Sequence, residues 1–169
     1  KPKGLNTLQE KFALVTVHRA ENTDDIARLS EIVAALNSLA KDMDVVVPLH
    51  PRTRKILEEN DLKLDVKTLD PVSYFEMIWL LKNCTVVLTD SGGLQKEAYF
   101  FSKPCVTLRD QTEWVELVEA GVNQLSEIKS EIILAHTNVA LDTNPELFSR
   151  TVLYGEADAA SKIVAEFLG

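Results

Sequence analysis

The residues with the clearest chemical potential form the run TDSGG at positions 89–93, which follows the apolar stretch 86–88. Glycines let a ligand approach the backbone closely, and the first turn of a helix offers unpaired N–H donors at the positive end of its dipole. This arrangement suits a phosphate group. Asp90 and Ser91 can accept hydrogen bonds from N–H groups at a helix start, and the glycines permit positive φ. The alternative is a well-capped strand-to-helix turn without a ligand.

Polar side chains also follow other predicted strands. Because the carboxyl ends of parallel strands meet at one edge of a sheet, we expect these side chains and the TDSGG run to form one cationic pocket. They are His18, Arg19, Glu21 and Asn22, then His50, Arg52 and Arg54, and finally Arg109, Asp110, Thr112, Glu113 and Glu116.

Each of these residues has a structural explanation beside the chemical one. A histidine at a strand end is commonly a hydrogen-bonded structural residue, and isolated arginines are commonly solvated surface charges. Glu97, in the first turns of the helix after TDSGG, either favours the helix dipole or accepts two hydrogen bonds from a ribose diol. The Trp114 indole either stacks on a base or fills the core, and we expect the core.

Several standard site motifs are absent from the sequence. No GxGxxG follows the first strand, no Walker sequence is present, and no GxSxG surrounds Ser91. The histidines and cysteines do not form a metal-type set, so neither a cofactor nor a metal is predicted. Cys84 and Cys105 each lie at the edge of an apolar run and are expected to be small core residues of a reducing compartment.

Length and charge narrow the class of protein. The 169 residues are enough for one domain with a sizeable core. A formal charge of −8 argues against general nucleic-acid binding, although local donors still permit an anionic ligand. No apolar run approaches the roughly 20 residues that span a membrane, and residues 1–6 do not lead into a signal core. We therefore expect a cytoplasmic protein without membrane contact.

Strands and helices alternate along the chain. Apolar runs at 12–17, 44–49, 66–69, 86–89 and 104–108 predict strands, with 122–125 a candidate sixth. Between them we expect helices, including one that Thr23 or Asp24 caps and that runs to about residue 41, one at 74–83 capped by Ser73, and one at 127–141 capped by Ser126. The alternation predicts an α/β fold with a doubly wound, Rossmann-like parallel sheet.

Five segments, in order, resemble the C-terminal domain of the UDP-N-acetylglucosamine 2-epimerases. They are LVTVHRAEN (14–22), PLHPRT (48–53), PVSYFEMIWLLKNCTVVLTDSGGLQKEA (71–98), KPCVTLRDQTEWVE (103–116) and LYGEADAASKIV (153–164). The resemblance implies one half of a GT-B-like enzyme of two Rossmann-like domains. Residues 1–10 would be the interdomain linker, 11–155 the UDP-binding domain, and 156–169 a helix that crosses back to the missing N-terminal domain.

The resemblance also implies roles for individual residues. Ser91, Gly92 and Gly93 would bind the diphosphate, Glu97 the ribose, and His18 would lie against the diphosphate as the catalytic candidate. The other UDP-binding residues would be Arg19, Asn22, Arg109 and Glu116. His50 matches a position near a regulatory UDP-sugar site, although HPRT at 50–53 departs from an Asn–Pro variant common in bacterial members.

The implied reaction removes the C2 proton of UDP-N-acetylglucosamine and expels UDP to form 2-acetamidoglucal. UDP then adds back to give UDP-N-acetylmannosamine for cell-surface polysaccharide synthesis, whereas hydrolysing members add water. The acid and base carboxylates would come mainly from the N-terminal domain, so the isolated half should bind UDP weakly and be inactive. A homodimer is implied for the full-length enzyme. A UDP-sugar glycosyltransferase domain and a non-catalytic nucleotide-binding module remain the alternatives.

Overall fold

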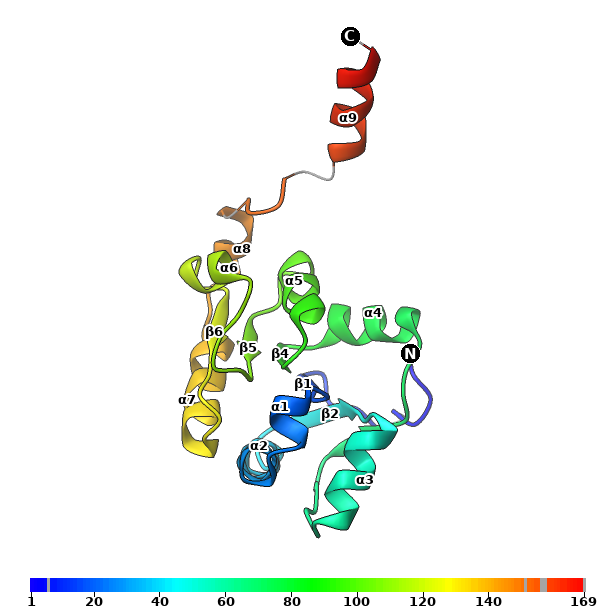
Figure 1. Cartoon of the computed structure of the whole chain (residues 1–169), viewed down its shortest axis with the longest axis vertical. Helices are drawn as coiled ribbons and strands as arrows, with labels where there is room; N and C mark the ends of the chain where they lie inside the picture. The colour runs from blue at the N-terminus through cyan, green and yellow to red at the C-terminus, as the bar shows by residue number, and fades with distance from the viewer. Residues whose placement is uncertain (6, 151, 156–157, 169) are drawn as a thin grey trace.

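A parallel sheet lies at the centre of the computed structural model, which describes residues 1–5, 7–150, 152–155 and 158–168 (Figure 1). Within these residues six strands pair in the order β3-β2-β1-β4-β5-β6, and every pairing is parallel. The predicted doubly wound α/β fold is confirmed, with strand order reversing between β1 and β4. The strands are β1 (Phe12–Thr16), β2 (Asp44–Pro48), β3 (Lys67–Leu69), β4 (Val86–Thr89), β5 (Cys105–Thr107) and β6 (Asn123–Leu125).

Helices cover both faces of the sheet because its strands are apolar on both sides. Ala13 and Val15 of β1 pack in the core with α2 (Ile26–Leu39), α3 (Pro51–Glu59) and α7 (Ser130–Leu141). The alternate residues Phe12 and Leu14 pack with α4 (Tyr74–Asn83) and α5 (Gly92–Phe100). Side chains along a strand point to opposite faces in turn, so β1 contributes to both halves of the core.

Four shorter or peripheral helices complete the described chain. They are α1 (Ala20–Thr23), α6 (Val115–Glu119), α8 (Glu146–Arg150) and α9 (Ala159–Leu168). Leu117 of α6 and Phe148 of α8 pack together in a small cluster of their own. Helix α9 stands away from the sheet (Figure 1), and its Ile163, Val164 and Phe167 are 57%, 55% and 85% exposed.

Two predicted helix starts are wrong. Residues 20–23 form the separate helix α1, so Asp25 caps α2 by accepting the N–H groups of residues 27 and 28. Helix α7 begins at Ser130 rather than at residue 127, and the buried Ser126 hydroxyl donates to the carbonyl of residue 127. The carboxylate of Glu31 in α2 accepts the Ser130 N–H at 2.7 Å, so a distant side chain supports this helix start.

The Ser73 cap is confirmed. Its hydroxyl accepts the N–H of Glu76, and the Glu76 carboxylate accepts the Ser73 N–H at 2.9 Å. The two cysteines are also confirmed as core residues, since Cys84 and Cys105 are buried and free. Burial raises the pKa of each thiol to about 12, which keeps both protonated at neutral pH. Across the described ranges, no helix combines the length and apolarity required for a bilayer crossing.

Candidate functional site

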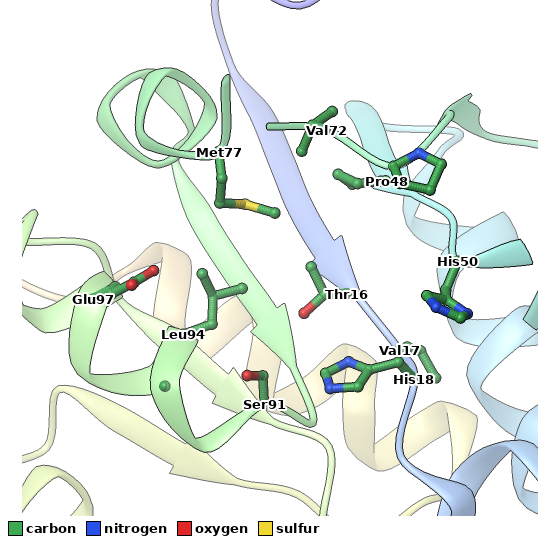
Figure 2. A pocket seen from close by; sticks show the side chains of 12 residues that line it. Thr16, Val17, His18, Pro48, His50, Val72, Met77, Ser91, Leu94 and Glu97 are labelled. Carbon is green, nitrogen blue, oxygen red and sulfur yellow. The ribbon is translucent and has the colours of Figure 1, made fainter. Parts of the chain in front are cut away.

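A pocket of about 360 Å³ opens at the carboxyl ends of β1 and β4, where the strand order reverses (Figure 2). Ligands of open α/β sheets bind at such a switch point. The loops after β1, β2 and β3 and the first turns of α4 and α5 supply its walls. The lining residues are Thr16, Val17, His18, Pro48, His50, Pro71, Val72, Met77, Ser91, Gly93, Leu94 and Glu97.

Helix α5 presents its N-terminus to this pocket. Ser91 is the N-cap residue in extended backbone, but its side chain makes no capping hydrogen bond, although its residue type allows one. Its own N–H donates instead to the Thr89 hydroxyl at 2.9 Å, which fixes the turn between β4 and α5. The N–H groups in the first turn of a helix lack intrahelical acceptors, so those of α5 are available to an anion beside the Ser91 hydroxyl.

The two glycines of this turn differ from each other. Neither adopts the positive φ that glycine permits, because both lie within α5. A Cβ on Gly92 would lie 2.0 Å from Oε1 of Glu113, so that carboxylate, which Arg109 holds, would have to shift. The nearest atom to a Cβ on Gly93 is the Ser91 hydroxyl at 4.0 Å, and Gly93 lines the pocket. Gly92 therefore faces the protein, and Gly93 faces the space for a ligand.

His18 lies beside this helix start. Its side chain is half exposed, lines the pocket, and points toward Ser91 in Figure 2. The fully buried Asp90 accepts the backbone N–H of His18 at 3.0 Å and that of Arg19 at 2.9 Å. Asp90 could have accepted hydrogen bonds from its own helix start, but it ties the loop after β1 to the end of β4 instead. An imidazole and free N–H groups thus face one space.

Glu97 lies one turn further along α5, on the same side of the helix as the pocket. Partial burial raises the pKa of its carboxyl group. Leu94 and Met77 lie on the side of Glu97, and Val72 continues this apolar wall toward Pro48 (Figure 2). A carboxylate can accept hydrogen bonds from the hydroxyl groups of a ligand ring. The apolar surface beside it can pack against a second, flat ring of the same ligand.

His50 lines the same pocket from the loop after β2 and lies opposite Glu97 in the view of Figure 2. It is the N-cap residue of α3, and its Nδ1 accepts the N–H of Arg52 at 3.2 Å. The structure thus brings His50 and His18 to one pocket. The regulatory role expected for His50 stays a prediction.

Asn22 does not reach the pocket, so its placement does not support direct contact with UDP. It has no exposed surface, and its Nδ2 donates to Asp90 at 3.2 Å and to the carbonyl of Leu108 at 2.9 Å. Its Oδ1 accepts from Nε of Arg28 at 3.2 Å. Through these buried hydrogen bonds Asn22 connects the residues that follow β1, β4 and β5. It can do so because an amide both donates and accepts hydrogen bonds.

Arg109 is likewise engaged within the protein. Its Nε donates to Glu21 at 3.0 Å and its Nη1 donates to Glu113 at 2.7 Å, and its side chain is 9% exposed. Burial opposes its charge, but the bonds to Glu113 and Glu21 outweigh that effect and raise its pKa. Arg19 is more exposed and lies 3.9 Å from Glu113. Neither arginine lines the pocket, so their predicted contact with UDP is not evident in this geometry.

Glu116 lies in a different cluster. The Tyr154 hydroxyl donates to it at 2.7 Å, and this bond holds the pKa of Glu116 below its usual value. Lys96 lies over the rings of Trp114 and Tyr154, at 4.4 Å and 4.2 Å from their centroids. Trp114 is partly buried and packs against the cluster of Leu117 and Phe148, so its expected core position is met only in part. Glu116 does not line the pocket either, so its predicted contact with UDP also lacks geometric support.

Sequence reasoning missed Gln95, which is 1% exposed. Its Oε1 accepts from the Thr112 hydroxyl at 2.7 Å and from Nδ2 of Asn123 at 3.2 Å. Nearby, Nε1 of Trp114 donates to the Gly92 carbonyl at 2.8 Å. These bonds hold the first turns of α5 against the loop after β5. The available signal was an amide between Leu94 and Ala98, two apolar residues of the buried side of the helix.

Comparison with known proteins places this arrangement in a family. The family model described as UDP-N-acetylglucosamine 2-epimerase matches residues 1–168. The chain is 52% identical over 168 residues to a UDP-2,3-diacetamido-2,3-dideoxy-D-glucuronate 2-epimerase of Pseudomonas aeruginosa, covering 99% of this chain and 46% of that protein. It is 44% identical to a UDP-N-acetylglucosamine 2-epimerase homolog of Methanococcus maripaludis, covering 95% of this chain and 45% of the relative.

The solved structures agree with the sequences. A Methanocaldococcus jannaschii UDP-GlcNAc 2-epimerase in complex with UDP-GlcNAc and UDP superimposes with a TM-score of 0.82 at 34% identity, covering 96% of this chain and 46% of that one. The chain thus spans about half the length of the relatives it matches. Fold, strand-end pocket and sequence together show that the chain belongs to the UDP-N-acetylglucosamine 2-epimerase family.

Proposed function

We propose that this chain is the UDP-binding half of a nucleotide-sugar 2-epimerase that acts on UDP-N-acetylglucosamine. One observation carries the proposal: the N-terminus of α5, His18 and Glu97 line a single pocket with an apolar wall. That combination matches the successive parts of UDP. The Methanocaldococcus jannaschii relative, whose structure holds UDP-GlcNAc and UDP, supports the choice of ligand.

In this proposal each part of UDP has its own contact. The diphosphate binds the first N–H groups of α5, the Ser91 hydroxyl and His18, because all three stand at one end of the pocket. The ribose hydroxyls donate to the Glu97 carboxylate one turn further on. The uracil ring lies against Met77 and Val72, since a planar base gains from burial on apolar surface.

The chemical role of this half is to hold the leaving group. When the C1–oxygen bond of the sugar breaks, negative charge grows on the diphosphate, and preorganised N–H donors with His18 stabilise it. Removal of the C2 proton needs carboxylates, which we assign to the other half of the full-length protein. Residues 1–10 would link the halves, and residues 156–169 would return to the other half through the exposed side chains of α9.

A second candidate substrate is UDP-2,3-diacetamido-2,3-dideoxy-D-glucuronate. The relative that carries this sugar in its name is 52% identical, against 44% for the Methanococcus maripaludis homolog. Both substrates have the same UDP leaving group and the same 2-epimerisation, so this pocket suits either. Turnover of the two UDP-sugars by the full-length protein would separate them, and loss of activity toward both would exclude the family reaction.

Titration calorimetry with UDP tests the binding site. The chain should bind UDP weakly, and Ser91→Ala and Glu97→Ala should each weaken binding by about tenfold, as expected for a hydrogen bond involving a charged group. Glu131→Ala is the matched control because Glu131 is an exposed residue in the first turn of α7. Absence of heat with the unaltered chain, or equal losses in all three variants, would contradict the proposed site.

The same proposal includes a cytoplasmic full-length protein that forms a homodimer. Light scattering of the full-length protein measures the assembly, with twice the monomer mass expected. The 169-residue chain should not convert UDP-N-acetylglucosamine without the other half, and epimerisation by it would show that its own groups suffice.

A further inference from the structure

Asp90 gathers donors from a single loop while remaining out of the pocket. It has no exposed surface, and its carboxylate accepts the backbone N–H groups of His18 and Arg19 and the Nδ2 of Asn22. These bonds are enough to fix the path of the loop after β1. A further contact reaches the ring itself, since Nδ1 of His18 lies 3.2 Å from Oδ1 of Asp90.

The ring contact has a chemical consequence. An ionised carboxylate can only accept hydrogen bonds, so the imidazole nitrogen next to it is favoured to carry the proton. Without ligand, neutral His18 then keeps its hydrogen on Nδ1 and presents Nε2 away from Asp90. When the diphosphate binds, Nε2 takes up a second proton and donates it to a phosphate oxygen, while Asp90 balances the charge of the imidazolium through Nδ1–H. Because the His18 side chain lines the pocket and points toward Ser91 (Figure 2), the geometry directs Nε2 to the space beside the N-terminus of α5.

We propose that Asp90 is a positioning residue that sets the tautomer and orientation of His18 toward the UDP diphosphate. This inference rests on the proposed function for the identity of the ligand. Asp90 itself does not line the pocket and acts through His18. A purely structural Asp90 would hold the loop but leave the protonated nitrogen of His18 unspecified.

Nitrogen-15 NMR of the chain without ligand tests the first step. At about pH 9, well above the ordinary histidine pKa, neutral His18 should carry its proton on Nδ1. The Asp90→Asn variant should move that proton to Nε2, because the new amide can donate to Nδ1. His18→Gln assigns the signals against His50 and His136. A proton on Nε2 of His18 in the unaltered chain would overturn the proposal without any variant.

UDP binding tests the second step. Asp90→Asn should weaken UDP binding by about tenfold, whereas in a His18→Ala background the same change should have no further effect. Asp65→Asn, at an exposed aspartate away from the pocket, is the control. Equal losses in both backgrounds would mean that Asp90 only supports the loop. UDP binding without this coupling overturns the inference and spares the proposed function, whereas no binding by the unaltered chain overturns the function.

If circular dichroism shows that Asp90→Asn does not fold, the effect of UDP on the His18 signals of the unaltered chain tests the proposal. UDP should then shift the Nε2 signal of His18 and leave Nδ1 nearly unchanged. A shift confined to Nδ1 would overturn the proposal.

Discussion

The first turns of α5 have two sides that are built differently. Toward the loop after β5, polar groups are buried and paired with one another, as in the bonds from Thr112 and Asn123 to Gln95. Toward the pocket, the Ser91 side chain makes no capping bond, and burial raises the pKa of Glu97. We infer that the paired side holds the helix in place and that the open side leaves its polar groups to a ligand.

This difference separates folding from binding within one helix. A buried polar group that loses its partner costs stability directly, whereas a polar group at an open pocket contributes mainly when the ligand is present. Substitutions on the paired side should therefore change the free energy of unfolding. Those on the open side should change the affinity for UDP.

Gln95→Ala should have the largest effect. It leaves a cavity and deprives both Thr112 and Asn123 of their acceptor, so we expect a loss of about 2–4 kcal/mol in the free energy of unfolding. Urea denaturation measures it. Gln111→Ala is the control because Gln111 is exposed. Equal stability of the two variants would mean that the buried amide network does not hold α5.

The two glycines provide a closer comparison, one on each side. Gly92→Ala places a methyl group against the Glu113 carboxylate, which Arg109 holds, so we expect a loss of about 1–3 kcal/mol in the free energy of unfolding. Gly93→Ala meets no close atom and should leave stability unchanged or slightly raised. Because Gly93 lines the pocket, its variant should weaken UDP binding in calorimetry.

A second background checks the cause assigned to Gly92. In Glu113→Ala the clashing carboxylate is absent, so adding Gly92→Ala should cost little further stability. A full additional loss would show that the strain at Gly92 has another source.

Sequence patterns were sufficient for the fold and for the rim of the pocket. Alternating apolar runs predict the parallel sheet, and residues directly after strands, such as His18 and Ser91, must lie at its carboxyl edge. Glu97 follows from helical spacing, one turn beyond the helix start. These inferences need only the spacing of apolar residues and the order of the elements, and both can be read from one amino-acid sequence.

Patterns could not tell which loop residues face the ligand and which face the protein. Asn22 and Arg109 stand in the same loops as His18, yet their side chains connect those loops to one another. That choice depends on partners distant in sequence, such as Asp90 for Asn22 and Glu21 for Arg109. The cap expected at Ser126 was wrong for the same reason, since Glu31 supports the start of α7.

Two serines test the comparison at a smaller scale. Ser73 caps α4 through a reciprocal pair of bonds with Glu76, whereas the Ser91 side chain does not cap α5. Ser73→Ala should therefore lower the free energy of unfolding by about 1 kcal/mol. Ser91→Ala should leave it nearly unchanged. Thermal denaturation of both variants measures this, and equal destabilisation would indicate that Ser91 supports the fold.

Glu97→Gln should show the smallest effect on stability. Since the pKa of Glu97 is raised on folding, the folded chain binds more protons than the unfolded chain between the ordinary and the raised value. The free energy of unfolding therefore falls as pH rises through that window. Above it, the ionised carboxylate makes the folded chain slightly less stable. Glutamine has no such step, so the variant should gain about 1–2 °C in melting temperature at pH 7, solvent screening keeping the gain small.

The gain must vanish at low pH if this account is correct. Below the ordinary carboxyl pKa both states of the chain are protonated at residue 97, so the two melting temperatures should converge near about pH 3. Glu58→Gln, at an exposed position of α3, controls for the loss of one negative charge.

The same Glu97→Gln variant should bind UDP more weakly, because a neutral amide is a poorer acceptor for a ribose diol. A gain in stability together with a loss of affinity would mark Glu97 as a group kept for the ligand, whereas a loss of both would place it on the supporting side of the helix.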